Sequence, residues 1–309
     1  MGRAAKVARP TFPARNQWNP EAPSPAASSR PAARLPLGTG PLVPTLPLDA
    51  TPQELAAARQ ALAARRPAQP LMPHIVQVNR PGTVGSSGTG NAAAMRAHMV
   101  QSLQQSGLHD GRVAQALLAV ERHCFVDSAL FTQAYLDTSL PIGLQQTISK
   151  PSVVARMIEL LLASPAMREQ GPQARLGRVL EIGTGCGYQA CVLGQVATEV
   201  YSIERLKGLH EKARANLRPF RIPNVHLILG DGMIGYPSGA PYAGIIAAAG
   251  GEHIPQAWVD QLAMGGRIVA PAAMGTGQQV LVVLDKTANG LQQALLEPVL
   301  FVPLKSGMA

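Results

Sequence analysis

The stretch VLEIGTGCGYQ, residues 179–189, places three glycines at alternate positions behind an acidic residue. Gly183, Gly185 and Gly187 remove side chains from a turn, so a ligand can lie against the backbone and accept hydrogen bonds from its amides. Glu181 stands two residues before the first of these glycines. A carboxylate at this place repels phosphates and suits a ligand that carries hydroxyl groups or a positive charge.

Two further acids follow at the spacing expected of a nucleoside site. Glu204 ends a second apolar run about twenty residues after the glycine loop, where an acid can accept hydrogen bonds from ribose hydroxyls. Asp231 and Gly232 end a third apolar run in the tripeptide GDG. Together with the glycine loop, these residues predict a nucleoside-binding crevice. The alternative is a tight turn between a strand and a helix that binds nothing.

The glycine spacing distinguishes between two nucleoside cofactors. The dinucleotide fingerprint G-x-G-x-x-G needs glycine at its sixth position for close helix packing, and this chain has Tyr188 there. Glu181 disfavours a pyrophosphate but suits the amino group and the sulfonium of S-adenosylmethionine. We therefore predict S-adenosylmethionine rather than NAD. The loop would hold its methionine part, Glu204 its ribose and Asp231 its adenine amino group.

The elements that would position these residues alternate between strand and helix. Five strands are predicted from the apolar runs at 178–182, 199–204, 225–231, 242–249 and 265–272. Helices are predicted between them at 190–196, 206–217 and 254–263. Two more apolar runs, 279–286 and 295–304, follow without an intervening helix. This order predicts an α/β fold with a doubly wound, Rossmann-like and mostly parallel sheet that has an antiparallel edge.

Helices are also predicted before the sheet. One spans 92–105 with Asn91 as its N-cap, a second spans 112–120, and a third begins at Pro151. The segment PIGLQQTISKP, residues 141–151, is predicted as a polar loop. Residues 91–309 are therefore expected to form one domain, in which 91–150 is a helical cap or substrate part and 151–309 is the cofactor-binding core.

The first 90 residues differ from the rest in composition. They hold 15 of the 27 prolines, and ten Lys/Arg against three Asp/Glu. Such a segment buries too little apolar surface to offset its ordering entropy, which predicts a disordered arm with one short helix at 51–66 and a linker at 82–90. An organellar transit peptide is the alternative. The positive charge of the arm predicts at most a weak contact with nucleic acid.

Other classes of protein are disfavoured by what the sequence lacks. Cys124, Cys186 and Cys191 show no C-x-x-C spacing, and the seven histidines show no H-x-x-x-H pair. No metal site and no disulfide framework is therefore predicted, and the free thiols favour a reducing, cytoplasmic compartment. No apolar run approaches the roughly 20 residues that a membrane-spanning helix needs, so no membrane partner is predicted.

The successive motifs VLEIGTGCGYQ, VYSIERLKGL, GDGMIGYPSGAPYAGIIAAA and GGRIVAPA resemble those of the class I methyltransferases. The loop LPIGLQQTISKPSVVARMIELL and the segment FVPL resemble the protein-L-isoaspartate O-methyltransferase family more specifically. The resemblance covers about residues 95–306 and leaves the arm unmatched. It implies methyl transfer from S-adenosylmethionine to the free α-carboxylate of L-isoaspartyl residues in damaged proteins, which initiates their repair. D-aspartyl residues are a further target class that the resemblance leaves open.

The same resemblance implies site residues in the loop before Pro151. Ser149, in the tripeptide TIS, would lie at the reaction centre, and Gln146, Thr147 and Ile148 would line the cofactor pocket. From the residues alone, Ser149 is equally an N-cap for the helix that begins at Pro151. Residues 247–254, AAAGGEHI, depart from the proline-containing turn that is common in the family, so the shape of the substrate cleft stays open there.

The residue types after the fourth strand favour a carboxylate as the methyl acceptor. A carboxyl group with a pKa of about 4 is ionised at neutral pH and needs no general base. Residues 247–250, three alanines and a glycine, offer no polar side chain that could orient an amine. Catalysis would then be mainly the alignment of acceptor, methyl group and sulfur. Two alternatives remain: a class I methyltransferase that acts on a small molecule or RNA, and a non-catalytic nucleoside-binding module.

Overall fold

The computed structural model describes residues 45–47, 88–171, 173–274 and 277–309. The short helix predicted at 51–66 and residues 82–87 of the predicted linker lie outside this part of the chain. Residues 88–90 belong to helix α2 (Gly88–Gln105), which therefore begins earlier than predicted. Asn91 lies inside this helix, so it is not the N-cap, because a capping residue must have a non-helical backbone.

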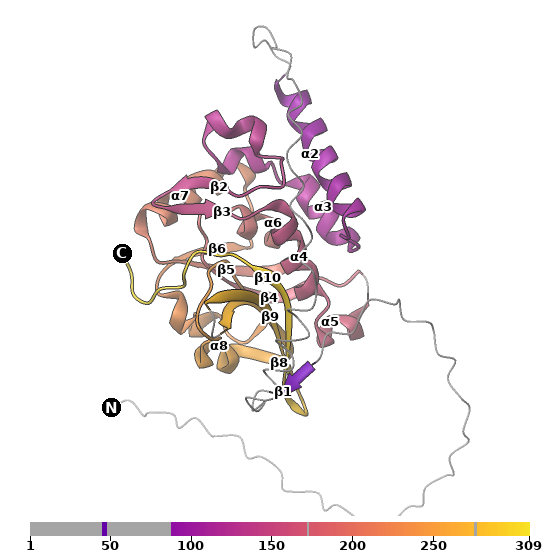
Figure 1. The fold of residues 1–309 in the computed structure, drawn as a ribbon, viewed down its shortest axis with the longest axis vertical. Helices are drawn as coiled ribbons and strands as arrows, with labels where there is room; N and C mark the ends of the chain where they lie inside the picture. The colour runs from indigo at the N-terminus through magenta and orange to yellow at the C-terminus, as the bar shows by residue number, and fades with distance from the viewer. Residues whose placement is uncertain (1–44, 48–87, 172, 275–276) are drawn as a thin grey trace, which may run out of the picture. The chain divides into compact units, whose positions relative to one another are not determined.

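An eight-stranded sheet forms the centre of the described residues (Figure 1). Its strand order is β1-β10-β9-β8-β7-β4-β5-β6. The strands are β1 (Thr45–Pro47), β4 (Leu176–Ile182), β5 (Ala197–Glu204), β6 (Val225–Leu229), β7 (Tyr242–Ala247), β8 (Leu262–Met274), β9 (Gln278–Thr287) and β10 (Gly290–Val299). The other helices are α3 (Gly111–Ala119), α4 (Pro151–Leu162), α5 (Pro165–Gln170), α6 (Tyr188–Val196), α7 (Lys207–Leu217) and α8 (Gln256–Gln261).

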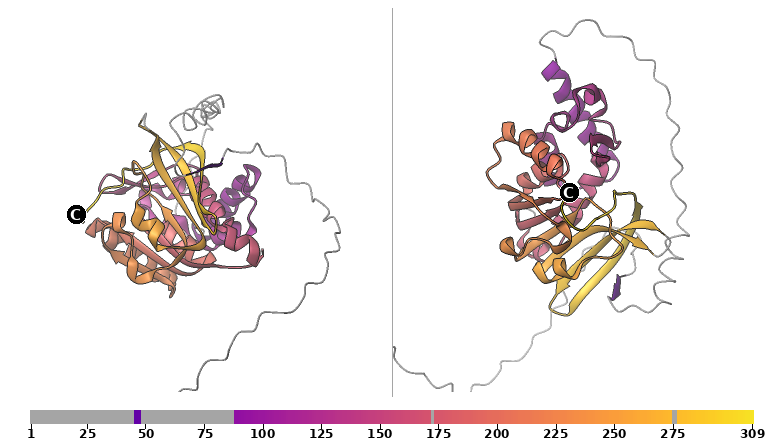
Figure 2. Two further views of the ribbon diagram at one scale, coloured as in Figure 1. Left: turned by 90° about the horizontal axis from the view of Figure 1, so that it is seen from below. Right: turned by 90° about the vertical axis from the view of Figure 1, so that its left-hand side faces the viewer.

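The sheet has a parallel and an antiparallel part. Strand β4 pairs in parallel with both β5 and β7, and β7 pairs in parallel with β8. Strands β8, β9 and β10 are antiparallel, and β9 and β10 form the long yellow pair in Figure 2. The predicted fold class is confirmed. Because the chain winds in opposite directions from β4 and from β7, a crevice opens over the carboxyl ends of these two strands, where such sheets bind ligands.

Alternate residues of the strands face two hydrophobic clusters. Val179 belongs to the cluster that contains residues of α2, α3, α4, α6 and α7, whereas Leu180 belongs to the cluster that contains Trp258 and Val259 of α8. Successive side chains of a strand point to opposite faces, so these clusters mark the two covered faces of the sheet. Among the described residues, no helix has the length and apolar character needed to cross a bilayer.

The last strand differs from its prediction. The sequence places it at 295–304, but β10 spans Gly290–Val299 and begins directly after a short turn from β9. Its pairing register shifts between Leu295 and Pro298, as expected where a proline has no N–H to donate to the ladder. The chain leaves the sheet after Val299, so residues 302–305 are not part of β10.

The segment predicted as a polar loop at 141–151 is in its first part a hairpin. Strands β2 (Leu140–Gly143) and β3 (Gln146–Ile148) pair in an antiparallel two-stranded sheet of their own. The prediction was wrong because the strands are very short, and only Leu140, Ile142 and Ile148 of them are buried. The Nζ of Lys212 donates a hydrogen bond to the carbonyl of Ile142 at 2.7 Å, which ties the hairpin to α7.

The turn of this hairpin has strained backbone. Leu144 and Gln145 have φ angles of 50° and 57°, and Gly143 before them has a φ of 94°. Two successive residues with positive φ resemble a type I′ turn, which favours asparagine and glycine. A residue other than glycine in this region costs of order 1 kcal/mol or more. Leu144 is also 58% exposed at the tip, so burial does not offset the strain.

The double substitution Leu144→Asn and Gln145→Gly should therefore stabilise the protein. We expect the free energy of unfolding to rise by about 0.5–1 kcal/mol, because both new residues accept positive φ. Denaturant unfolding measures this change. Leu144→Ala is the control, since it shortens the side chain without relieving the backbone strain. Equal stabilities of the double variant and the parent protein would contradict the strain argument.

Candidate active site

A cavity of about 340 Å³ lies over the carboxyl ends of β4, β5 and β7. Its wall combines the β2–β3 hairpin, the glycine loop after β4, the end of β5, the turn after β7 and residues 302–305. Of the residues predicted from the sequence, the wall includes Gln146, Thr147, Ile148, Ser149, Gly183, Gly185, Glu204 and Gly232. Glu181, Gly187 and Asp231 lie outside the wall.

The glycine loop depends on positive φ angles. Gly183, Gly185 and Gly187 have φ values of 89°, 56° and 91°, which side chains other than glycine rarely adopt. The N–H of Gly183 donates to the carbonyl of Ile203 at 2.8 Å and joins the loop to β5. Gly187 does not line the cavity but begins helix α6, where a side chain would meet Leu217 at 3.1 Å.

Glu204, at the end of β5, holds the loop and the following turn with its carboxylate. Its Oε2 accepts a hydrogen bond from the N–H of Gly185 at 2.9 Å, and its Oε1 accepts one from the N–H of Leu206 at 2.9 Å. The side chain lines the cavity although the residue is only 5% exposed. Because each carboxylate oxygen has two lone-pair sites, Glu204 retains acceptor capacity for hydroxyl groups of a ligand.

Glu181 lies beneath the cavity, completely buried in β4. Its Oε2 accepts a short hydrogen bond from the hydroxyl of Ser202, which also lies 2.6 Å from the Thr184 hydroxyl. Burial raises the pKa of Glu181 to about 8, even though the hydrogen bond from Ser202 acts in the opposite direction. Its other oxygen, Oε1, has no partner among the described residues.

Asp231 is occupied by backbone groups on the far side of Gly232. Its Oδ1 accepts from the N–H of Met233 at 2.8 Å, and its Oδ2 accepts from the N–H of Gly307 at 2.6 Å. Gly232 itself lines the cavity, and its carbonyl accepts a hydrogen bond at 2.8 Å from the indole N–H of Trp258, which is 1% exposed. Asp231 thus joins the third strand end to the segment that follows residues 302–305.

The turn after β7, whose shape the sequence left open, pairs with this same segment. The N–H of Gly250 donates to the carbonyl of Val302 at 2.9 Å, and the N–H of Leu304 donates to the carbonyl of Gly250 at 2.8 Å. Ala248 and Ala249 line the cavity beside Val302, Pro303, Leu304 and Lys305. No site residue was predicted at 302–305, because no local sequence pattern marks a segment that reaches the cavity only through long-range pairing.

Ser149 lies where two cavities meet. A second cavity, of about 380 Å³, shares Thr147, Ser149, Ala248 and Val302 with the first and is also lined by Lys150. The alternative in which Ser149 caps the next helix was wrong: the N-cap of α4 is Lys150, without a side-chain hydrogen bond. The first turn of α4 is held instead by Asp137, which accepts from the N–H and the hydroxyl of Ser152, both at 2.8 Å.

Arg122 was missed in the sequence analysis, although it contacts both loops at the cavity. It lies in the 3-10 turn η1 (Arg122–Phe125) and is completely buried. Its Nη2 donates to the carbonyl of Ser149 at 2.7 Å, its Nε donates to the carbonyl of Ala134 at 2.8 Å, and its guanidinium lies 4.7 Å from the ring centre of Tyr188. One sequence signal exists, a charged residue between the apolar Val120 and Phe125, but such positions are usually exposed.

The first cavity fits a polar nucleoside ligand. The Oη of Tyr188 and the Nε2 of Gln189 are buried in its wall and have no hydrogen-bond partner among the described residues. Each of these atoms faces a neighbouring protein group: the Tyr188 hydroxyl lies beside the guanidinium of Arg122, and the Gln189 amide lies beside the carboxyl group of Glu181. The glycine backbone and the Glu204 carboxylate converge in this cavity at one switch point of a doubly wound sheet. This arrangement defines a class I methyltransferase, which uses S-adenosylmethionine as methyl donor.

The chain belongs to the protein-L-isoaspartate(D-aspartate) O-methyltransferase family, whose model matches residues 91–309. It is 51% identical over 284 residues to a protein-L-isoaspartate O-methyltransferase of Methylibium petroleiphilum, a match that covers 91% of this chain and 99% of the relative. It is 55% identical to one of Ralstonia nicotianae over 228 residues, 71% of each chain. The first match extends well into the 90 N-terminal residues, which the sequence resemblance had left unmatched.

Solved structures agree with this assignment. A protein-L-isoaspartate O-methyltransferase is similar with a TM-score of 0.61 and 27% identity, over 69% of this chain and 67% of that one. A Plasmodium falciparum protein in complex with S-adenosyl-L-homocysteine has a TM-score of 0.56 at 24% identity, over 68% of this chain and 98% of that one, and supports the fold.

Substituting glutamine for Glu181 should flatten the dependence of stability on pH. The pKa of Glu181 is about 8 in the folded protein, against an ordinary value of 4.5, so between these pH values the folded protein holds a proton on Glu181 that the unfolded chain has lost. The stability of the protein should therefore fall as the pH rises from 4.5 towards 8. Glu181→Gln should raise the free energy of unfolding at pH 8 by about 1–3 kcal/mol and change it little at pH 5.

Thermal unfolding of both proteins at pH 5, 7 and 8 measures this effect. Glu211→Gln is a suitable control because Glu211 is an exposed acid on α7. Parallel pH profiles of Glu181→Gln and the parent protein would show that the buried carboxyl does not hold the proton.

Removing the guanidinium of Arg122 should destabilise the protein and weaken cofactor binding together. Arg122→Met leaves the buried carbonyl of Ala134 and the part-buried carbonyl of Ser149 without these donors, so we expect a loss of about 2–4 kcal/mol in unfolding free energy. Cofactor affinity should fall as well, because Ser149 and Tyr188 lose their common contact. Denaturant unfolding and calorimetry with S-adenosylhomocysteine measure the two effects.

Arg175→Met is the matched control for this variant. Arg175 also donates to two carbonyls, those of Gly194 and Ala197, but does not line the cavity. It should destabilise the protein without a change in cofactor affinity at a temperature where both variants are folded. Equal affinities of the two variants would limit Arg122 to a role in stability.

Proposed function

We propose that this protein transfers a methyl group from S-adenosylmethionine to the free α-carboxylate of isoaspartyl residues in damaged proteins, with the transfer taking place at Ser149. The family assignment supports the reaction. The observation that carries the location is the shared wall: Ser149 lines both the nucleoside cavity and the second cavity beside it. A methyl group that passes from a cofactor in the first cavity to an acceptor in the second must cross at this wall.

The cofactor would be held by backbone and carboxylates at the strand ends. We assign its methionine part to Gly183 and Gly185, with Gly187 shaping the loop, and its ribose to Glu204. Gln146, Thr147 and Ile148 would cover it from the hairpin, and Gly232 would contact the adenine. Asp231, which lies outside the cavity wall, would act on the adenine only by setting the position of Gly232. Glu181 would act through the buried Ser202–Thr184 pair beneath the loop.

Methyl transfer to a carboxylate requires few catalytic groups from the protein. Bound S-adenosylmethionine would supply an electrophilic methyl group, which an oxygen nucleophile can take from the sulfonium sulfur with the neutral thioether as leaving group. An isoaspartyl α-carboxylate is already ionised at neutral pH, so no general base is needed. The chain's own contribution is alignment: the Ser149 hydroxyl, which is half-buried and makes no hydrogen bond in the described part of the chain, can donate one to the carboxylate.

Lys150 adds a charge to the acceptor cavity. It is exposed, follows Ser149 directly and lines the second cavity, where its ammonium group would attract a carboxylate. The apolar residues Pro298, Val299 and Phe301 also line this cavity. An isoaspartyl residue differs from an aspartyl residue by one methylene group moved from the side chain into the main chain. A narrow cavity that fixes both carboxylate and main chain can detect this shift.

We also propose a domain organisation and a compartment for this protein. We infer a catalytic domain at 91–309 and an arm at 1–90 that is not part of the active site, with residues 45–47 of the arm paired as β1 with β10. Cys124, Cys186 and Cys191 are all free thiols, which is typical of the cytoplasm. Proteins and peptides with isoaspartyl residues would be the partners, rather than nucleic acids.

Ser149→Ala tests the assignment of the reaction centre. We expect turnover of an isoaspartyl peptide to fall by about 10- to 1000-fold, the range up to the loss of a donor in an oxyanion-type site, while the affinity for S-adenosylhomocysteine stays nearly unchanged. Single-turnover methylation with labelled cofactor measures the first quantity and calorimetry measures the second. The same peptide with a normal aspartyl residue should not be methylated.

Ser102→Ala is the matched control, because Ser102 is exposed on α2 and lines neither cavity. It should retain most of the activity. Full activity of Ser149→Ala would remove Ser149 from the reaction centre without affecting the assigned reaction. Failure of the parent protein to methylate the isoaspartyl peptide would overturn the proposed function and return the small-molecule, RNA and non-catalytic alternatives to consideration.

A further inference from the structure

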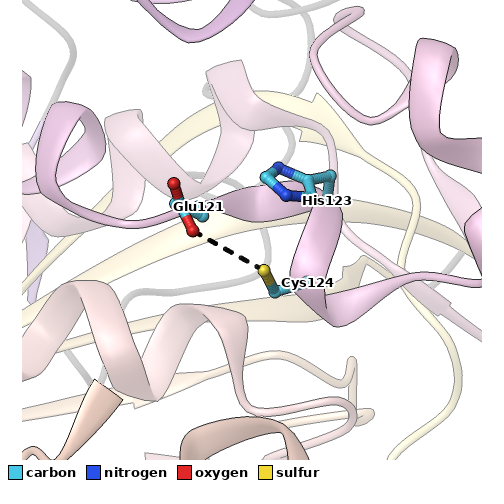
Figure 3. A group of neighbouring side chains, drawn as sticks. All are labelled: Glu121, His123 and Cys124. Carbon is cyan, nitrogen blue, oxygen red and sulfur yellow. Dashed lines mark hydrogen bonds between the residues drawn. The ribbon is translucent and has the colours of Figure 1, made fainter. Parts of the chain in front are cut away.

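A cluster of three potential metal ligands lies apart from both cavities, at the turn η1. Glu121, His123 and Cys124 each offer one ligand atom, and these atoms all lie within 4.8 Å of one another. Figure 3 shows the three side chains gathered on one side of the turn. The sequence predicted no zinc site because the chain has neither C-x-x-C nor H-x-x-x-H spacing. A 3-10 turn brings residues of the shorter pattern E-x-H-C together instead.

We propose that Glu121, His123 and Cys124 bind a divalent transition-metal ion, with zinc as the best fit. Carboxylate, imidazole and thiolate are all zinc ligands, whereas a sulfur and a nitrogen ligand disfavour magnesium and calcium. The Oε2 of Glu121 lies 3.8 Å from the Sγ of Cys124. Zinc bond lengths of about 2.0 Å to oxygen and 2.3 Å to sulfur place tetrahedral ligands about 3.5 Å apart. The two atoms are therefore close to a ligating distance already.

The ring of His123 is held in the manner of a metal ligand. Its Nδ1 lies 2.7 Å from the hydroxyl of Tyr135, and its ring is in a T-shaped contact with that of Phe131, with ring centres 4.9 Å apart. A metal-binding histidine commonly uses its second nitrogen to contact a neighbouring group, which fixes the tautomer and the ring orientation. With the proton on Nδ1, the lone pair of Nε2 is available to an ion.

Glu121 is oriented by a second contact. The Nη1 of Arg96 on α2 donates to its Oε1 at 3.3 Å, which leaves Oε2 for the ion. The positive charge of Arg96 opposes a cation, so the site should bind more weakly than a structural zinc site with four protein ligands. Glu121 and Cys124 are exposed, and water can complete the coordination.

Charge balance favours binding with loss of one proton. The thiol of Cys124 must release its proton to solvent when the sulfur binds the ion, because the thiolate is the ligand. The thiolate and the Glu121 carboxylate then neutralise the two charges of the ion. No bond other than S–H is broken, and no redox change takes place.

A bound ion would also affect the active site, because the cluster includes both chain neighbours of Arg122. Arg122, which donates to the carbonyl of Ser149, lies between Glu121 and His123 in the chain. An ion that joins the two neighbours of Arg122 would restrict the backbone of the turn that presents the guanidinium. The site is thus suited to brace the turn η1.

Spectroscopy with cobalt and calorimetry with zinc test this proposal on the full-length protein. Co²⁺ added to the reduced protein should give the thiolate-to-cobalt charge-transfer band in the near ultraviolet, and Zn²⁺ should abolish it. In Cys124→Ser the band should be absent, and zinc affinity should fall by about 10-fold or more in Cys124→Ser and His123→Gln. Tyr135→Phe should weaken binding by about 10-fold, as expected for the loss of a contact that orients a ligand.

His98→Ala is the control, because His98 is an exposed histidine on α2 outside the cluster. It should bind zinc and cobalt like the parent protein. Absence of the charge-transfer band in the parent protein, or equal zinc affinity in the parent protein and Cys124→Ser, would overturn the proposal. Glu121 and Cys124 are exposed and His123 is half-buried, and circular dichroism of each variant checks that it is folded.

Discussion

The buried guanidinium of Arg122 joins the two parts of the chain that have to meet at the active site. One part is the segment that leads to α4 and contains Ser149; the other is the glycine loop and the start of α6, which contains Tyr188. Burying a positive charge is unfavourable unless its donors are used. Two backbone carbonyls accept hydrogen bonds from Arg122, and the face of the Tyr188 ring contacts its guanidinium. If either loop moved alone, the guanidinium would become exposed or would lose its contact with that loop. The distance between the loops is therefore set by the buried contacts of Arg122 rather than by the residues of the cavity wall.

The cavity wall itself is made largely of backbone, and this determines how its acids act. The glycines with positive φ bring N–H groups and carbonyls to the surface, and Glu204 accepts hydrogen bonds from two such N–H groups. Glu181 lies one layer deeper and is shielded from the cavity by the loop. Both carboxylates thus organise the protein before any ligand is present. A ligand then meets a loop that is already in place, which reduces the entropy lost on binding.

The sequence was sufficient for the features that depend on local pattern. The apolar runs and the glycines predicted the parallel sheet, the glycine loop and the place of Glu204. The length of each apolar run and the position of the glycines after it show directly where a strand ends. The hairpin at 140–148 was missed because its strands are too short to show a period. Arg122 and residues 302–305 were missed for another reason: their contacts join residues far apart in the chain, and no spacing records them. The capping alternative for Ser149 was wrong because Asp137, which is distant in sequence from α4, holds the first turn of that helix.

The indole of Trp258 lies directly behind the cavity wall, where its N–H donates to the carbonyl of Gly232. The chain has only one other tryptophan, Trp18, in the N-terminal arm. In a protein shortened to residues 88–309, all tryptophan fluorescence would therefore come from a single buried ring one residue removed from the ligand. Its emission could then report occupancy of the site without any attached dye, and stopped-flow mixing could time the arrival and departure of cofactor and product.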